Sequence, residues 1–215
     1  MVVVIDYGMG NLKSVSKALE TLGASVRVSS DPLDVAKAEK LMLPGVGAFP
    51  AAMRELSARK LIDPIKTAIA SGTPYLGICL GLQLLFERSE EGTGADGLGI
   101  LAGTVKRFPF GPPSTVHHPP LKVPHMGWNQ VRPPSTVHGP RGGCPMLREI
   151  LEGSFVYFVH SYYANPTDRS VVALESEYGV PFTAMVWRQN LYATQFHPEK
   201  SQAVGLQLLK NFVSL

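Results

Sequence analysis

Short apolar segments alternate with amphipathic segments through the first 90 residues of the chain. VVVID (2–6) ends at a glycine-rich turn, and apolar residues then recur at helical spacing from Leu12 to Leu22. Further apolar segments at 25–30, 40–45 and 74–78 are each followed by a polar or amphipathic stretch. Strands that are apolar throughout and separated by helices form parallel sheets with both faces covered. The pattern therefore predicts an α/β fold, built on a mostly parallel open sheet with helices on both faces.

Three of the amphipathic stretches are long enough to be predicted as single helices. We expect helices over 51–72 and over 80–90, each directly after a predicted strand. The final stretch, 201–215, carries apolar residues at helical spacing and should pack back on the sheet as a helix. In sheets of this kind, function gathers at the carboxyl ends of the strands. Glycines mark three of those ends, at 6–11, 44–49 and 77–81.

The second half of the chain carries shorter strand candidates that no helix separates. Such a pattern is typical of hairpins, so we expect a mixed or antiparallel C-terminal extension. The candidates are 104–108, 154–163, 171–178, 182–187 and 191–196. Two Pro- and Gly-rich segments, 108–124 and 132–145, both contain PPSTVH and are expected to be surface loops. We expect residues 1–215 to form one domain.

Charge and hydropathy argue against several classes of function. The chain carries 20 Lys and Arg against 17 Asp and Glu, and its basic residues are spread between acids except for a weak cluster at Lys106, Arg107 and Lys122. Because no basic stripe is interleaved with exposed aromatics, we expect no nucleic-acid partner. No apolar run approaches the roughly 18 residues of a membrane span, and MVVVID lacks the basic region of a signal peptide. We therefore expect a cytoplasmic protein without membrane contact.

The chain has only two cysteines, Cys79 and Cys144. They make neither a disulfide framework nor a metal-ligand spacing, so we expect two thiols and neither a metal nor a cofactor. Cys144 lies on a proline-flanked loop and is interpreted as structural. Cys79 lies in GICLGL (77–82), where an apolar run gives way to a predicted helix.

The setting of Cys79 resembles a nucleophile elbow. A nucleophile on a sharp strand-to-helix turn is raised clear of the sheet, and the turn needs small neighbours such as Gly77 and Gly81. The free N–H groups at the start of the helix would favour the thiolate and supply a donor to an oxyanion. The alternative is that Cys79 is a small buried hydrophobic residue, as most lone cysteines are.

A candidate base for this thiol lies in QFHPEK (195–200). Pro198 favours an extended conformation at His197, and extended residues at i and i+2 project to the same side. Glu199 would then hold one ring nitrogen of His197 while the other faces a thiol, which is the arrangement of a catalytic triad. The alternative is a strand-terminating turn with a solvated His and Glu. Of the six histidines, only His197 has a carboxylate two residues on.

Several motifs together resemble the class I, or triad, glutamine amidotransferase family. GICLGLQLL and QFHPE match the catalytic segments of that family, on a chain of alternating strands and helices with PGVGAF at an earlier strand end. Within the family, one subfamily has similar segments in the same order, the glutaminase subunits of imidazole glycerol phosphate synthases. The segments are IDYGMGNLKSV, LPGVGAF, KVPHMGWN, YFVHSYY and QFHPEKSQ. The resemblance covers essentially the whole chain.

The resemblance implies hydrolysis of glutamine to glutamate and ammonia through a cysteine thioester. The ammonia would pass to a separate cyclase subunit for synthesis of imidazole glycerol phosphate and AICAR in histidine biosynthesis. Cys79 would be the nucleophile, His197 the base and Glu199 the carboxylate that orients the ring. The oxyanion donors would be backbone N–H groups of Leu80 and Val46.

The resemblance also implies a glutamine-binding wall from three parts of the chain. Its members would be Gly45, Gly47, Gln83, His160, Ser161 and Tyr162. Gln83 stands at i+4 from Cys79 and so can face the same pocket. The alternative for Gln83 is a solvated position on the helix surface.

We expect the cyclase subunit to contact Asn11, Trp128 and Lys200. The resemblance places their motifs near the subunit interface, and Trp is enriched in interface hot spots. A core position is the alternative for Trp128. The proline-rich loops are longer than the family pattern, and they are not assigned to the interface.

Other functions share part of this pattern. Amidotransferases that serve anthranilate, aminodeoxychorismate, guanylate or pyridoxal phosphate synthesis would share GICLG and HPE, but not DYGMGN or HMGWN. A free-standing thiol peptidase or γ-glutamyl hydrolase could use the same three residues and would need no partner. A binding module with a vestigial elbow is disfavoured because every triad residue is present.

Overall fold

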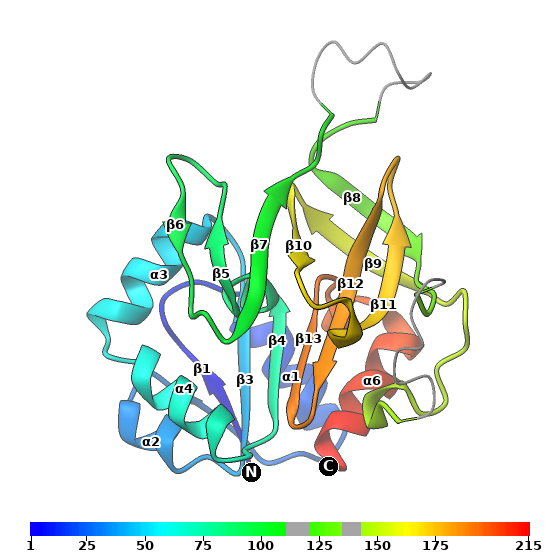
Figure 1. Ribbon diagram of the computed structural model, residues 1–215. Helices are drawn as coiled ribbons and strands as arrows, with labels where there is room; N and C mark the ends of the chain where they lie inside the picture. The colour runs from blue at the N-terminus through cyan, green and yellow to red at the C-terminus, as the bar shows by residue number, and fades with distance from the viewer. Residues whose placement is uncertain (111–120, 135–142) are drawn as a thin grey trace.

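A seven-stranded sheet forms the centre of the computed structural model, which describes residues 1–110, 121–134 and 143–215 (Figure 1). The strand order across this sheet is β11-β12-β13-β4-β3-β1-β2. In chain order these strands are β1 (Val2–Ile5), β2 (Val26–Ser29), β3 (Lys40–Gly45), β4 (Tyr75–Cys79), β11 (Val172–Glu177), β12 (Pro181–Arg188) and β13 (Leu191–Thr194).

The direction of the strands confirms the predicted mixed sheet. The neighbours β2, β1, β3, β4 and β13 are parallel to one another, whereas β12 is antiparallel to both β13 and β11. The last strand of the C-terminal hairpins therefore completes the parallel sheet. As a consequence, a strand from the end of the chain lies directly beside β4, which ends in Cys79.

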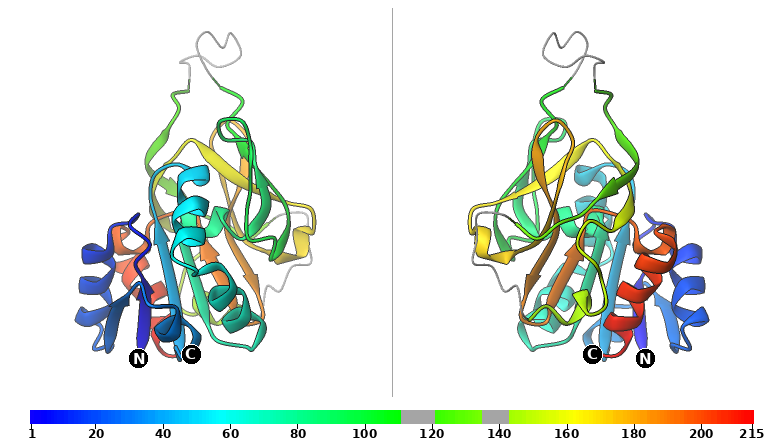
Figure 2. Two further views of the ribbon diagram at one scale, coloured as in Figure 1. Left: turned by 90° about the vertical axis from the view of Figure 1, so that its left-hand side faces the viewer. Right: turned by 90° about the vertical axis from the view of Figure 1, so that its right-hand side faces the viewer.

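Helices cover both faces of the central sheet (Figure 2). On one face lie α1 (Leu12–Thr21) and α6 (Gln202–Val213), which contact each other. The other face is covered by α2 (Pro32–Ala36), α3 (Phe49–Ala58) and α4 (Ile62–Ala70). The predicted layers are thus confirmed.

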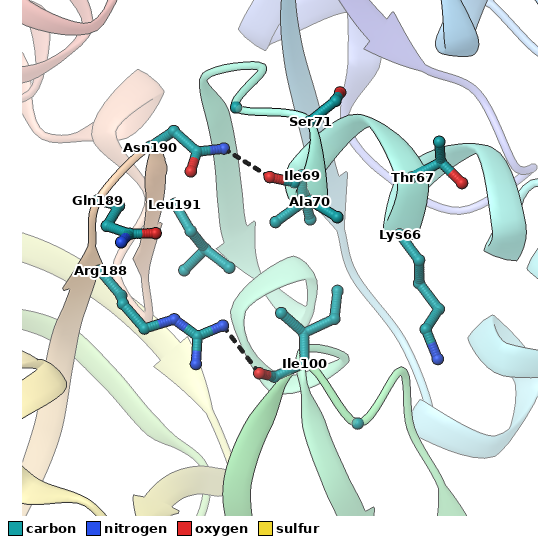
Figure 3. A pocket seen from close by; sticks show the side chains of 12 residues that line it. Lys66, Thr67, Ile69, Ala70, Ser71, Ile100, Arg188, Gln189, Asn190 and Leu191 are labelled. Atoms are coloured by element: carbon teal, nitrogen blue, oxygen red, sulfur yellow. Dashed lines mark hydrogen bonds between the residues drawn. The ribbon is translucent and has the colours of Figure 1, made fainter.

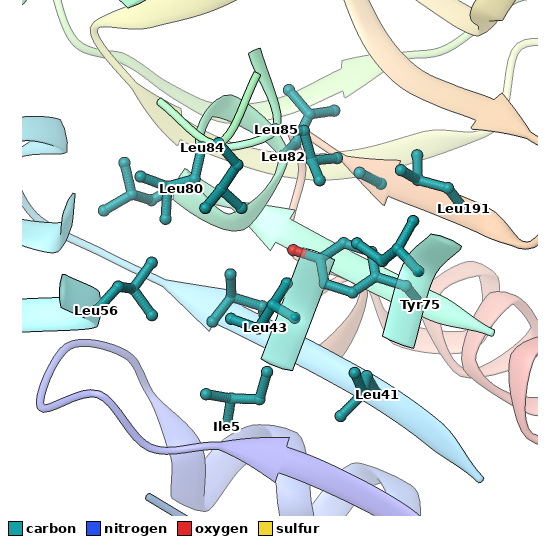
Figure 4. Close-up of a cluster of buried hydrophobic side chains, with 14 of the residues drawn as sticks. Ile5, Leu41, Leu43, Leu56, Tyr75, Leu80, Leu82, Leu84, Leu85 and Leu191 are labelled. Carbon is teal, nitrogen blue, oxygen red and sulfur yellow. The ribbon is translucent and has the colours of Figure 1, made fainter. Parts of the chain in front are cut away.

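Each face has its own apolar core, because successive strand residues point in opposite directions. In β1, Val3 and Ile5 join one cluster, and Val2 and Val4 join the other. Figure 4 shows the first cluster, in which Tyr75 lies among leucines from β3 and from the segment that follows β4. Burial of this kind is the main source of stability in such a fold.

Two of the predicted helices differ in the structure. The predicted helix 51–72 is divided into α3 and α4, because Lys60 adopts a left-handed φ of +56° that ends the first helix. The predicted helix 80–90 is wrong beyond its first turn. The helix α5 (Leu80–Gln83) is followed by strand β5 (Phe86–Ser89), and both Leu84 and Leu85 are fully buried. A short apolar run does not distinguish a buried strand from a buried helix.

Two smaller sheets stand beyond the carboxyl ends of the parallel strands. One contains β5, β6 (Ala95–Asp96), β7 (Leu101–Arg107) and β10 (Tyr162–Pro166), and the other pairs β8 (His125–Gln130) with β9 (Phe155–His160). The predicted strand 154–163 is therefore two strands in different sheets, separated at Ser161. Short 3-10 helices complete the described elements: η1 (Pro145–Leu147), η2 (Arg169–Val171) and η3 (Pro198–Lys200).

Parts of two predicted loops lie outside the described residues. These include the first PPSTVH copy and most of the second, together with His117, His118 and His138. Across the ranges that the structure describes, no helix is both long and apolar enough to cross a membrane.

Candidate active site

Three glycine- or proline-marked segments meet at one edge of the central sheet. In the parallel register, Gly45 at the end of β3 pairs with Cys79 at the end of β4, and Ile78 pairs with Thr194 at the end of β13. The segments PGVG, GICLG and QFHPE therefore leave the sheet side by side. This is the edge at which parallel α/β sheets carry their sites.

The backbone at Cys79 is strained. Its φ is +56° and its ψ is −105°, a backbone conformation that residues other than glycine rarely adopt. The turn is possible because its neighbours lack side chains. An added Cβ at Gly81 would lie 1.9 Å from the Leu43 carbonyl oxygen, and one at Gly77 would lie 2.5 Å from the Gly81 oxygen. The structure therefore has the elbow that the sequence predicts.

The helix after the elbow is only one turn long, in contrast to the predicted helix 80–90. A single turn supplies unpaired N–H groups at its start, but not the dipole of a long helix. The N–H groups of Leu80 and its successor are thus the local donors next to the thiol.

His197 and Glu199 are buried together behind the thiol. Proline at 198 begins η3, and His197 has the extended conformation that the sequence predicts, with φ −98° and ψ 98°. Glu199 Oε1 lies 2.8 Å from His197 Nδ1, and both side chains are at most 2% exposed. The alternative of a solvated turn is therefore wrong. Within the described part of the chain, His197 Nε2 makes no hydrogen bond.

The electrostatic surroundings of His197 favour the protonated ring. Burial alone lowers the pKa of His197, but the charge of the Cys79 thiolate and the Glu199 carboxylate outweigh it and raise the pKa to about 10. Of the raising influences, the interaction with Cys79 is the largest. A protonated ring between a thiolate and a carboxylate is the arrangement of an activated cysteine nucleophile.

A pocket of about 340 Å³ opens in front of Cys79. It brings together eight residues that the sequence predicts for the site: Val46, Gly47, Cys79, Leu80, Gln83, His160, Ser161 and Tyr162. Gly45 is buried and does not line the pocket. It is packed against Tyr7, because a Cβ at this position would lie 2.3 Å from the Tyr7 hydroxyl. The pocket is of a size for a small amino acid.

Gln83 is held inside the protein and not on a solvated surface. Its Nε2 donates to the Tyr162 carbonyl at 2.9 Å and to Gln195 Oε1 at 3.1 Å. Gln195, fully buried, in turn places its Nε2 3.6 Å from Cys79 Sγ. Sequence reasoning missed Gln195, although it begins the QFHPE segment, because its contact with the thiol depends on the pairing of β13 with β4.

A second missed residue is Glu91, which also lines the pocket. Its Oε2 accepts a hydrogen bond from the Phe49 N–H at 2.7 Å and so caps α3, whose own N-cap residue Ala48 has no side-chain acceptor. No local pattern in the sequence marks Glu91. A carboxylate on the pocket wall is suited to bind a substrate ammonium group.

The three predicted interface residues do not line this pocket. Trp128 is 46% exposed on β8, so its alternative as a core residue is wrong. Its ring lies 6.1 Å from that of Tyr157, and Lys200 Nζ lies 5.8 Å from the same Tyr157 ring. Asn11 is exposed and caps α1 by accepting from the Ser14 N–H, and α1 contacts η3, which carries Lys200.

A larger pocket, of about 630 Å³, lies between the end of α4 and the β12–β13 turn (Figure 3). Lys66 and Arg188 border it, and Asn190 donates to the Ile69 carbonyl at its rim. Of the residues placed in the structure, those that line it include no cysteine, histidine or carboxylate. The pocket at Cys79 is therefore the candidate active site. Among the residues that the structure describes, no group of three or more His, Cys, Asp or Glu is placed to hold a metal ion.

Comparisons with known proteins match the whole chain to one family. The family model described as glutamine amidotransferase class-I matches residues 3–215. A protein from Syntrophotalea carbinolica is 54% identical over 212 residues, covering 99% of this chain and 98% of its own length. Proteins from Geobacter metallireducens (50% identical, 98% and 96% covered) and Geobacillus thermodenitrificans (51% identical, 100% and 96% covered) are similar to the same extent. All three carry the name imidazole glycerol phosphate synthase subunit HisH.

Solved structures support the fold. A crystal structure of a glutamine amidotransferase matches with a TM-score of 0.72 at 17% identity, covering 100% of both chains. The glutaminase domain of CTPS from Trypanosoma brucei, with bound acivicin, matches with a TM-score of 0.64 at 14% identity, covering 99% of this chain and 90% of that one.

Proposed function

The chain belongs to the class-I glutamine amidotransferase family, and from this premise we propose that it hydrolyses glutamine to glutamate and ammonia as the glutaminase subunit of an imidazole glycerol phosphate synthase. The observation that carries the proposal is the strained elbow of Cys79 in front of the buried His197–Glu199 pair. We treat residues 1–215 as one amidotransferase domain and expect it in the cytoplasm.

In the first half of the reaction, Cys79 is acylated. The thiolate attacks the side-chain amide carbon of glutamine, and the carbonyl oxygen becomes an oxyanion. The protonated His197 ring gives its Nε2 proton to the departing ammonia, so that the tetrahedral intermediate collapses to a thioester. Glu199 keeps the ring in place and stabilises its charged form through Nδ1.

The second half of the reaction releases glutamate. With ammonia gone, the neutral His197 takes a proton from water, and the hydroxide attacks the thioester carbon through a second oxyanion. Sulfur then leaves as the thiolate and the ring is again protonated. The backbone N–H groups of Leu80 and Val46 are the proposed oxyanion donors, and loss of one such donor typically costs roughly a hundred- to a thousand-fold in rate.

Two parts of the pocket wall would bind the rest of the substrate. Gln83 and the backbone of 160–162 lie on one side, and Gly47 permits close approach at the oxyanion loop. The Glu91 carboxylate would bind the ammonium group of glutamine. Because Glu91 also caps α3, its position does not depend on the substrate.

The proposed partner is a separate cyclase subunit, with which the chain forms a heterodimer. Support comes from the exposed face of the β8–β9 sheet, which presents Met126, Trp128 and Phe155 to solvent. Trp128 and Lys200 lie around one tyrosine of that face, and Asn11 is exposed at the start of α1. An apolar centre with a charged rim is the usual composition of a protein interface.

The closest competing function is an amidotransferase for a different acceptor, and the next is a free-standing thiol hydrolase. Both would use the same triad and would differ in the partner. Relatives at 50% identity or more over nearly full length are named as subunits of imidazole glycerol phosphate synthases, which favours the cyclase as the partner.

The test is release of ammonia from glutamine by the purified chain, alone and with a cyclase subunit plus its ribonucleotide ligand. We expect activity that the cyclase stimulates and that Cys79→Ala abolishes. Cys144→Ala is the matched control, because burial raises the pKa of that thiol to about 12 and it lies outside the pocket. Equal activity with and without the cyclase would indicate a free-standing hydrolase. Absence of activity in every mixture would exclude the proposed function.

A further inference from the structure

Two histidines outside the triad, one of them in the pocket wall, form a buried hydrogen-bonded pair. His125 on β8 and His160 on β9 are direct register partners, 3% and 5% exposed. His125 Nδ1 lies 3.0 Å from His160 Nε2, and His160 Nδ1 lies 2.8 Å from the Tyr162 carbonyl oxygen. We refer to His125 and His160 as the histidine pair.

A single backbone carbonyl decides where the protons of the histidine pair are. Because the Tyr162 oxygen can only accept, His160 must carry its proton on Nδ1, and its Nε2 is then an acceptor. His125 must therefore donate from Nδ1, which leaves its own Nε2 to accept from the Asn129 amide at 3.4 Å. Asn129 can present its NH2 group there, because the same group donates to the Glu177 carbonyl at 2.7 Å.

The same carbonyl also fixes the side-chain amide of Gln83 and, through it, that of Gln195. Gln83 must face Tyr162 with its NH2 group, and that group also donates to Gln195 Oε1. Gln195 consequently has its own NH2 group directed at Cys79 Sγ, 3.6 Å away. We refer to Gln83 and Gln195 as the amide pair. If Gln83 were turned over, its oxygen would face the Tyr162 carbonyl oxygen, and if Gln195 were turned over, its NH2 group would face that of Gln83; either mismatch is costly at a buried site.

The histidine pair stays neutral at ordinary pH. Burial lowers the pKa of His125 to about 4 and that of His160 to about 3. A charged ring would also place two N–H donors against each other. The pair therefore has no acid–base role near pH 7, and its contribution must come from its geometry.

We propose that the histidine pair positions the glutaminase site by holding the Tyr162 carbonyl in place, the acceptor that orients the amide pair so that Gln195 donates to the Cys79 sulfur. A donor at this atom stabilises the thiolate before attack and the same sulfur as it leaves the thioester. Gln83 is held with its carbonyl oxygen free to meet the substrate, since both of its N–H groups are used. The inference rests on the proposed function.

His125 allows a clean test because it does not line the pocket and has aromatic neighbours. Its ring stacks on Tyr178 at 4.1 Å and on Phe158 at 4.9 Å between centroids. His125→Phe keeps this packing and removes the donor to His160. His125→Asn is the matched variant, because its side-chain amide has an N–H near the position of Nδ1.

We expect His125→Phe to lower kcat/KM for glutamine about tenfold, the typical effect of one buried hydrogen bond, with His125→Asn recovering most of the loss. Alkylation of Cys79 by iodoacetamide, in a Cys144→Ala background, should slow severalfold in the phenylalanine variant. In a Gln83→Leu background, which breaks the chain, His125→Phe should have no further effect on alkylation. The 15N spectra of the two imidazoles should show the Nδ1–H form in both rings.

Several results would overturn this proposal. One is a folded His125→Phe protein with unchanged kcat/KM and an unchanged rate of alkylation. Another is an Nε2–H form of either ring, and a third is that the effects of His125→Phe and Gln83→Leu on alkylation simply add. Additive effects, together with a lower Tm, would mean that the pair only stabilises the fold. If the unaltered chain alkylates as expected but never hydrolyses glutamine, the proposed function fails, while alkylation and the spectra still decide the hydrogen-bond chain.

Discussion

Replacing Gly81 by alanine should displace the nucleophile, because the elbow has no room for a Cβ. The new atom would lie 1.9 Å from the Leu43 carbonyl oxygen, whereas real Cβ atoms essentially never come closer than 3.0 Å. The two backbones must therefore separate by 1.1 Å or more, the difference between these distances. Neither backbone can move without cost, since Leu43 lies in the paired strand β3 and Gly81 lies in α5, the single turn that follows β4.

The size of the effect follows from this displacement. A misplacement of about 1 Å in a catalytic constellation costs on the order of a hundredfold in rate. We therefore expect Gly81→Ala to lower kcat/KM about a hundredfold, which corresponds to about 2.7 kcal/mol of transition-state stabilisation. The free energy of unfolding should fall by about 1–3 kcal/mol, as is typical of an overpacked core.

Two further glycines calibrate the measurement. Gly77→Ala meets the Gly81 oxygen at 2.5 Å, a smaller overlap, and should lose less activity. Gly99→Ala meets nothing within 4 Å but has a φ of +62°, so it costs only backbone strain of about 1–2 kcal/mol. It should therefore lose stability and keep full activity.

The assay is glutamate formation in the presence of the cyclase, with urea unfolding on the same preparations. Nearly full kcat/KM in a folded Gly81→Ala protein would show that the elbow can take up a Cβ without displacing the thiol. If Gly99→Ala lost as much activity as Gly81→Ala, loss of stability alone would account for both results.

Three other changes test separate parts of the site. Glu199→Gln removes a charge that raises the pKa of His197, so the ring should lose its proton at a lower pH than in the unaltered chain. The alkaline limb of the kcat/KM profile should therefore shift to lower pH, and an unshifted limb would contradict this. Glu91→Gln keeps an acceptor for the α3 cap but loses the charge, and KM for glutamine should rise about tenfold with kcat nearly unchanged; an unaltered KM would exclude the contact. Trp128→Ala should weaken binding of the cyclase by about thirtyfold in calorimetry, whereas Leu151→Ala, at a still more exposed position, should not, and equal effects would place the interface elsewhere.

The parts of the fold that the sequence predicts well are those with a local cause. Apolar runs bounded by glycine are enough to predict a parallel sheet covered on both faces, since strands that are apolar throughout must be buried on both of their faces. The contact between His197 and Glu199 is predictable in the same way. Proline restricts the residue before it, and His197 has the expected extended conformation. Glu199 itself lies in the 3-10 helix η3, so the contact forms across a tight turn and not by alternation along a strand.

The parts that the sequence does not predict depend on pairing between distant segments. Gln195 lies at the thiol only because β13 returns to pair with β4, a contact across 116 residues. The strand β5 was not predictable either, because the apolar run that leads into it is compatible with a helix until its partner β7 is known. Glu91 follows β5 along the chain, so its place at the pocket also depends on the pairing of β5 with β7.

The direction of the Cys79 side chain depends both on local backbone conformation and on the packing of distant segments. By alternation along β4, Cys79 should share a face with Tyr75, whose cluster contains the leucines of the following segment. Instead it belongs to the cluster of Leu76 and Ile78 on the opposite face, the one covered by α1 and α6. The positive φ is what turns it, at a cost on the order of 1–3 kcal/mol that the surrounding structure must hold in place. QFHPE runs from β13 to the start of α6 on that opposite face, so the strain aims the sulfur at its base. A strand that ended in relaxed geometry would leave the same triad residues in the sequence and no triad in the fold.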